Sequence, residues 1–206
     1  MLVKICGITR LEDAEAAVAA GAEAIGFVFW PKSPRFIDPH RARRIALALP
    51  PLVTVVGVFV NQPVDYVNGV ASLVRLGAVQ LHGDESPEFA AAVSIPVIKA
   101  VSVDNVDTGA WTARTTLLLD VHDPAARGGT GRTIDWAAAA DVAAQRRVLL
   151  AGGLTPDNVA DAVARVRPFG IDVSSGVERA PGIKDPQRLR ALFEAVHDIG
   201  HITTRS

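Results

Sequence analysis

The sequence has very little cysteine: Cys6 is the only one among 206 residues. A single cysteine excludes an internal disulfide and any zinc cluster built from several cysteines. The chain also lacks an excess of either charge, since 21 Lys and Arg face 22 Asp and Glu and the formal net charge is -1. We therefore expect no basic surface that would neutralise phosphates along a nucleic acid, and no nucleic-acid partner.

Long apolar runs are missing as well. The longest uncharged run, residues 45–64, contains three prolines, so it predicts a helix end, a loop and a buried strand rather than a membrane helix. The N-terminus has no signal-peptide pattern, because Lys4 interrupts its first apolar stretch. We expect a cytoplasmic protein with no membrane partner.

The composition is that of a globular chain, with 49% hydrophobic and 21% charged residues. Short apolar runs rich in β-branched residues recur along it, and such runs are typical of strands buried on both faces. Eight runs are expected to be strands: Leu2–Cys6, Ala24–Phe29, Val53–Phe59, Ala78–Leu81, Pro96–Val101, Thr116–Asp120, Arg147–Ala151 and Gly170–Val173.

Between these runs lie alanine-rich stretches with helix-start signals. Thr9 to Glu12 has the capping-box pattern, and elsewhere a capping side chain stands before a proline. Four positions have the second signal: Asp38, Ser86, Thr155 and Asp185. Eight strands alternating with eight helical segments predict a TIM (β/α)8 barrel, with one catalytic domain over residues 1–206. An open doubly wound sheet fits less well, because the first turn after a strand lacks the G-x-G-x-x-G pattern.

The active site of such a barrel lies at the C-terminal ends of its strands, and unusual polar residues collect there. Lys4 and Cys6 share strand parity, so both should point into the barrel, where Lys4 needs a carboxylate partner. We expect that partner to be Asp172 on the neighbouring strand. Gln80 and His82 also share parity and are expected to line the pocket. The histidines show no paired spacing on one element, so we expect no metal.

Two loops predict a phosphate site. Phosphate sites in these barrels are commonly built after strands seven and eight, where glycine lets backbone N–H groups approach the oxygens. The candidates are Gly152 and Gly153 in one loop and Ser174, Ser175 and Gly176 in the other. Residues 128–131 are also glycine-rich, but no Gly-Lys-Ser/Thr follows them, so they are expected to form a flexible loop beside Asp120 and not a P-loop.

Six segments stand out for their motifs: Val3–Thr9, Gly26–Arg35 (GFVFWPKSPR), Gln80–Gly83 (QLHG), Leu118–Asp120 with Gly128–Trp136 (GGTGRTIDW), Ala151–Asn158 (AGGLTPDN) and Gly170–Glu178 (GIDVSSGVE). In this order they resemble the phosphoribosylanthranilate isomerase family. The resemblance runs from residue 2 to about residue 195, and the order of the motifs makes it specific.

This resemblance implies an Amadori rearrangement of tryptophan biosynthesis. The family converts N-(5'-phosphoribosyl)anthranilate into 1-(2-carboxyphenylamino)-1-deoxyribulose 5-phosphate, without a metal or organic cofactor. Carried over by motif, Cys6 is the general base and Asp120 the general acid. Arg35 is the candidate for the anthranilate carboxylate, because a guanidinium matches a carboxylate with two hydrogen bonds. The partner is then a small phosphorylated substrate.

Two alternatives stay open on the sequence. One is another sugar-phosphate-binding barrel enzyme of amino-acid biosynthesis, such as indole-glycerol-phosphate synthase, although Cys6 and Asp120 fit its chemistry less well. The other is a noncatalytic sugar-phosphate-binding barrel, since fold does not imply function. The chain is expected to be a monomer or a homodimer.

Overall fold

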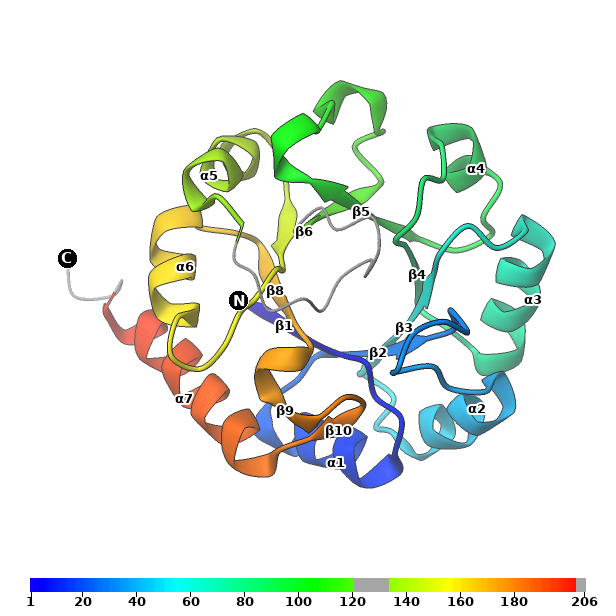
Figure 1. Ribbon diagram of the computed structural model, residues 1–206, viewed down its shortest axis with the longest axis horizontal. Coiled ribbons are helices and arrows are strands. Elements are labelled where there is room, and N and C mark those ends of the chain that lie inside the picture. Colours follow the sequence, from blue (N-terminus) through cyan, green and yellow to red (C-terminus); the bar gives the residue numbers. More distant parts are fainter. Residues whose placement is uncertain (121–133, 203–206) are drawn as a thin grey trace.

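The centre of the molecule is a closed barrel of eight parallel strands (Figure 1), seen in a computed structural model that describes residues 1–120 and 134–202. Strands pair in chain order, and β1 closes the barrel on β8. The predicted barrel is confirmed, and no strand end differs from its expected position by more than one residue. The strands are β1 (Leu2–Cys6), β2 (Ala24–Val28), β3 (Thr54–Phe59), β4 (Ala78–Leu81), β5 (Val97–Ser102), β6 (Thr116–Asp120), β7 (Val148–Leu150) and β8 (Gly170–Val173).

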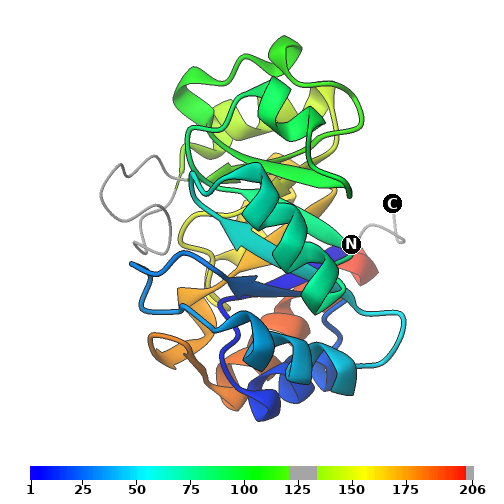
Figure 2. The same ribbon diagram turned by 90° about the vertical axis from the view of Figure 1, so that its right-hand side faces the viewer.

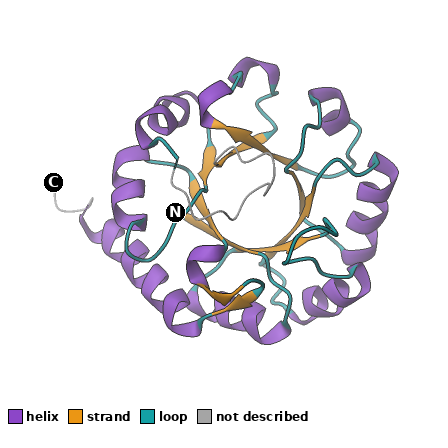
Figure 3. Cartoon of the chain, viewed as in Figure 1, coloured by secondary structure: helices purple, strands orange, loops and turns teal. Residues whose placement is uncertain are grey.

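Helices surround the ring of strands (Figure 3). They are α1 (Leu11–Ala20), α2 (Pro39–Ala48), α3 (Val64–Val74), α4 (Pro87–Ala91), α5 (Trp136–Gln145), α6 (Val159–Val166) and α7 (Pro186–Ile202).

The prediction of a helical segment in every crossover is wrong between β5 and β6. This crossover contains two short 3-10 turns, η1 (Val103–Asn105) and η2 (Thr108–Ala110), and no α-helix. The Ser102 hydroxyl and the Asp107 carboxylate accept hydrogen bonds from backbone N–H groups of these turns. Such local side-chain bonds compete with helix formation, which explains the tighter turns.

Three of the predicted helix starts are confirmed, because Asp38, Ser86 and Asp185 accept hydrogen bonds from backbone N–H groups two or three residues later. The prediction of a capping box at Thr9 is wrong, because the Thr9 hydroxyl instead donates a hydrogen bond to the carbonyl of Gly182, at 2.6 Å. The start at Thr155 is also wrong, since α6 begins only at residue 159. Long-range and loop contacts therefore override the local signal at these two positions.

The two faces of the sheet carry different residues. The outer face and the helices form one large apolar cluster, whereas the inward residues form small apolar clusters. Lys4 and Gln80, which are 0% and 1% exposed, belong to the inward set. In the register, Lys4 lies opposite Ala24 on one side and Asp172 on the other. The interior thus combines apolar packing with buried polar groups.

A two-stranded hairpin follows β8 and is not part of the barrel. Its strands, β9 (Glu178–Ala180) and β10 (Ile183–Lys184), are antiparallel. Figure 2 shows the barrel from the side, with the N-terminus at one end and the orange hairpin towards the other. The hairpin therefore lies at the end of the barrel where the active site is expected.

Candidate active site

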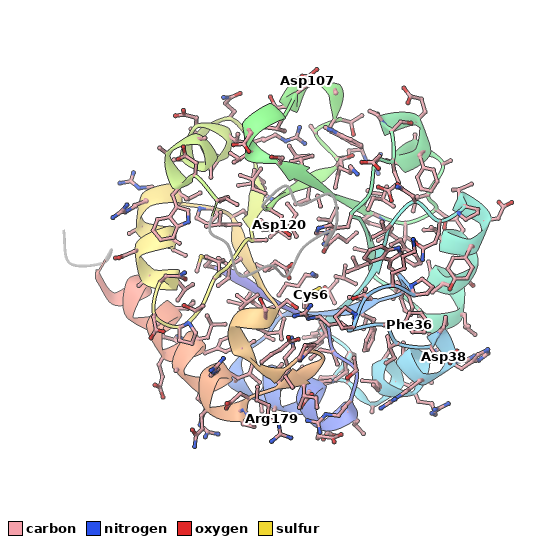
Figure 4. The ribbon with its side chains drawn as sticks, in the orientation of Figure 1. Cys6, Phe36, Asp38, Asp107, Asp120 and Arg179 are labelled. Atoms are coloured by element: carbon pink, nitrogen blue, oxygen red, sulfur yellow. The ribbon has the colours of Figure 1, made fainter. Side chains whose placement is uncertain are left out.

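Cys6 and Asp120 are the last residues of β1 and β6 and lie inside the ring of strands in Figure 4, away from Asp38 and Asp107 at the periphery. Gly26, the partner of Cys6 in the register, makes room for the thiol. A Cβ atom at Gly26 would lie 2.8 Å from Cys6 Sγ and 3.2 Å from Lys4 Cε. Any larger residue there would displace the thiol.

Burial raises the pKa of the Cys6 thiol above its ordinary value. Loss of solvation is the largest cause, and the negative charge of Asp172 adds to it, while the positive charges of Lys4 and Lys184 act in the opposite direction. The nearby ammonium of Lys4 alone would favour the thiolate, but desolvation outweighs its effect.

Alkylation of the ligand-free protein should report this shift. A raised pKa leaves less thiolate at any given pH, so the rate constant for iodoacetamide should reach half its maximum above about pH 8.5, the midpoint of an ordinary cysteine. The measurement is the alkylation rate against pH, with the urea-unfolded chain as control. A midpoint in the folded protein at or below that of the unfolded chain would contradict it.

The predicted partner of Lys4 is confirmed. Its Nζ lies 2.7 Å from Oδ1 of Asp172, across the seam where β1 meets β8. Burial acts to lower the pKa of Lys4, but the charges of Asp172 and Cys6 raise it by more, so the net shift is upward. Lys4 is therefore a stable ammonium beside the thiol.

Gln80 and His82, which the sequence predicts to line the pocket, connect Lys4 to Asp120. Lys4 Nζ donates to Gln80 Oε1 at 2.9 Å, and Gln80 Nε2 lies 2.8 Å from His82 Nδ1. His82 Nε2 in turn lies 3.4 Å from Asp120 Oδ2. One continuous polar chain thus links the surroundings of the thiol to the carboxylate of β6.

Arg35 lies at the same end but is not an open guanidinium. Its Nε and Nη2 donate to the two oxygens of Glu178, at 2.9 and 2.7 Å. The methylene groups of Arg35 pack over Gly7, where a Cβ atom would lie 2.5 Å from Arg35 Cδ. Among the described residues Nη1 makes no hydrogen bond, and Glu178 occupies the edge formed by Nε and Nη2. The edge formed by Nη1 and the second hydrogen of Nη2 is therefore the part of Arg35 that can meet a carboxylate.

Lys184 joins this cluster from the hairpin. Its buried Nζ contacts Glu178 Oε1 at 2.8 Å and donates to the carbonyls of Cys6 and Ser174, at 2.5 and 3.1 Å. Loss of solvation lowers the pKa of Lys184, and Glu178 partly offsets this effect. Desolvation acts to raise the pKa of Glu178, but its hydrogen bonds with Arg35 and Lys184 and their charges lower it overall.

Glu178 and Lys184 were absent from the residues predicted from sequence. Glu178 stood in a recognised motif, so a signal existed. Lys184 had none, since a two-residue strand shows no periodicity.

The predicted phosphate residues come together after β7 and β8. Gly152 and Gly153 have φ values of 81° and 66°, a backbone region that favours glycine. Gly176 packs against the neighbouring loop, where a Cβ atom would lie 1.9 Å from the carbonyl oxygen of Leu154. Ser174 and Ser175 lie between β8 and this glycine. Two loops distant in sequence thus form one glycine- and serine-lined corner.

The glycine-rich segment 128–131 lies outside the described residues. Within residues 1–120 and 134–202, no group of three or more His, Cys, Asp or Glu side chains is placed to hold a metal ion. No helix in this described part of the chain is long and apolar enough to cross a membrane.

Known proteins are similar to this chain over almost its whole length. The profile of the N-(5'phosphoribosyl)anthranilate (PRA) isomerase family matches residues 3–195. The N-(5'-phosphoribosyl)anthranilate isomerase of Citrifermentans bemidjiense is 52% identical over 203 residues, which is 97% of this chain and 98% of that protein.

Solved structures agree. The phosphoribosyl anthranilate isomerase of Thermus thermophilus is 46% identical, with a TM-score of 0.87 over 97% of this chain and 100% of that chain. A crystal structure of phosphoribosyl anthranilate isomerase in complex with reduced 1-(o-carboxyphenylamino)-1-deoxyribulose 5-phosphate is 43% identical, with a TM-score of 0.82 over 96% of this chain and 100% of that chain.

Proposed function

The chain belongs to the N-(5'-phosphoribosyl)anthranilate isomerase family, and from this premise we propose how its own residues perform the rearrangement. The substrate is N-(5'-phosphoribosyl)anthranilate and the product 1-(2-carboxyphenylamino)-1-deoxyribulose 5-phosphate. Cys6 acts as general base and Asp120 as general acid. The observation that carries the proposal is their position. Cys6 is the last residue of β1 and Asp120 the last residue of β6, and these strands lie three positions apart around the eight-stranded ring.

The reaction needs one acid and one base on different sides of the reacting carbons. Asp120 donates a proton to the furanose ring oxygen, the bond from C1' to that oxygen breaks, and a protonated Schiff base forms. The Cys6 thiolate then removes the proton from C2', which gives an enolamine. C1' gains a proton and the C2' hydroxyl loses one as the enolamine becomes the ketone. Two protons are gained and two are lost, so the product is an isomer of the substrate and the protein ends with the protons it began with.

Binding uses the two ends of the substrate. Nη1 of Arg35, held by Glu178, donates to the anthranilate carboxylate, and a charge-assisted bond of this kind contributes about 1.5–3 kcal/mol. The corner formed by Gly152, Gly153 and residues 174–176 binds the 5'-phosphate. Gly152 and Gly153 support this assignment, because their positive φ values permit a backbone that side chains would exclude.

The remaining expectations follow from the same proposal. We expect residues 1–206 to form one catalytic domain in the cytoplasm that needs no metal or cofactor. Its partner is the phosphorylated substrate, with no nucleic acid or membrane involved, and it works as a monomer or a homodimer.

A fluorescence assay tests the function. Freshly made phosphoribosylanthranilate should lose its anthranilate-type fluorescence when the purified protein is added, at a rate proportional to protein concentration. The control is the Asp120→Asn variant, which should bind the substrate without comparable turnover. Tight binding by the unaltered protein with no fluorescence loss would instead indicate a noncatalytic sugar-phosphate-binding barrel.

A further inference from the structure

Four polar residues have no part in the proton transfers proposed above: Asp172 on β8, Lys4 on β1, Gln80 on β4, and His82, the residue after β4. Three hydrogen bonds join them in that order, and Nε2 of the partly buried His82 lies 3.4 Å from Asp120 Oδ2. Three of these residues, Lys4, Gln80 and Asp172, are 0%, 1% and 9% exposed. The order of donors and acceptors along such a hydrogen-bonded chain is fixed, because some of its groups can only donate hydrogen bonds.

Lys4 sets that order. An ammonium has no acceptor, so the Gln80 atom 2.9 Å from Lys4 Nζ is the amide oxygen. The amide nitrogen then faces His82 Nδ1 at 2.8 Å. An amide NH2 only donates, so Nδ1 accepts and carries no proton. Turning the amide over would place NH2 against the ammonium and leave two donors in contact.

The proton of a neutral His82 ring is consequently on Nε2, which lies 3.4 Å from Asp120 Oδ2. In this tautomer the Nε2–H group of His82 faces Asp120 Oδ2 and can donate to it on a small approach. In the other tautomer Nε2 would offer a lone pair, and it would compete with the furanose oxygen for the proton of Asp120. The choice of tautomer therefore matters for a carboxyl group that acts as an acid.

We propose that Gln80 is a positioning residue that fixes the Nε2–H tautomer of His82, so that His82 donates to Asp120 and does not take its proton. The proposal rests on the proposed function, because it assumes that Asp120 is the general acid. His82 then acts on Asp120 as a hydrogen-bond donor, and Gln80 acts only through His82.

Packing alone does not require a glutamine here. The register places Gln80 between Val58 on β3 and Ile98 on β5, and both are apolar. An amide costs free energy to bury unless it is hydrogen-bonded. An aliphatic side chain would suit this layer of the barrel, so the amide is better explained by its two directed hydrogen bonds.

The direct test is the tautomer itself. Nitrogen-15 to proton correlation spectra of the imidazole rings, recorded near pH 8, should show His82 with its proton on Nε2; the His82→Gln variant identifies its signals. A His82 ring protonated on Nδ1 would overturn the proposal. This measurement needs no turnover, so its outcome is independent of whether the proposed function holds.

Gln80→Glu should reverse the tautomer. One carboxylate oxygen would accept from Lys4 and the other from His82 Nδ1–H, which leaves Nε2 as an acceptor towards Asp120. We expect the spectrum to show the proton on Nδ1, and kcat to fall about 10-fold or more while KM changes less than about 2-fold. An unchanged tautomer with an equal loss of kcat would show that the added charge acts directly.

His82→Gln supplies the matched control, since its amide can donate to Asp120 but has no basic nitrogen. This variant should keep kcat within about 5-fold of the unaltered enzyme, whereas His82→Ala should lose more. Gln80→Glu should cause no further loss in the His82→Gln background, because its target is gone. A full additional loss in the double variant would refute a role through His82.

Discussion

Replacing Cys6 by Ala, or Asp120 by Asn, is expected to lower kcat at least about 10²-fold with little change in KM. Each change removes a proton transfer that occurs in the transition state, whereas the binding groups at Arg35 and the glycine loops stay intact. Steady-state kinetics with phosphoribosylanthranilate would measure both parameters.

Asp38→Asn is the control for the carboxylate change. Asp38 lies at the periphery in Figure 4, and asparagine caps a helix as well as aspartate does, so its kcat should stay within about 2-fold. Turnover close to that of the unaltered enzyme in Cys6→Ala or Asp120→Asn would remove the residue concerned from the mechanism.

Lys184→Met is expected to destabilise the fold by about 3–5 kcal/mol, the usual cost of removing one partner from a buried ion pair. The Lys184 side chain is 0% exposed, and its ammonium is shared by Glu178 and two backbone carbonyls. For a chain of about 200 residues this loss lowers Tm by about 6–20 °C.

Urea unfolding followed by circular dichroism would measure the free energy of unfolding. Lys32→Met, which makes the same change at an exposed lysine, should alter it by less than about 0.5 kcal/mol. A loss below about 1 kcal/mol at Lys184 would mean that the cluster adds little to stability.

The barrel could be predicted because its strands carry regular signals. Apolar runs locate each strand, and side-chain alternation places Lys4 beside Asp172 once the ring closes, so even a contact between the two ends of the barrel follows from parity. The interior position of Cys6 and Gln80 follows from the same reasoning.

The rest depends on irregular structure and on solvent exclusion. Glu178 and Lys184 reach Arg35 and Cys6 through a hairpin whose path no periodic pattern describes. The raised pKa of Cys6 depends on how completely folding removes water, which the neighbouring charges in the sequence do not reveal. Polar turn residues such as Asp107 likewise replaced an expected helix by local hydrogen bonds.

The pairing of β1 with β8 also affects how the chain folds during its synthesis. Lys4 and Asp172 are 168 positions apart in the chain, and Cys6 and Lys184 are 178 apart. A ribosome releases the N-terminal end first, so the nascent chain presents its thiol and its inward ammonium long before their partners emerge. Until β8 has been synthesised, one edge of β1 has no strand to pair with. The contacts that close the barrel between β1 and β8 can therefore form only after β8 and the hairpin have been synthesised.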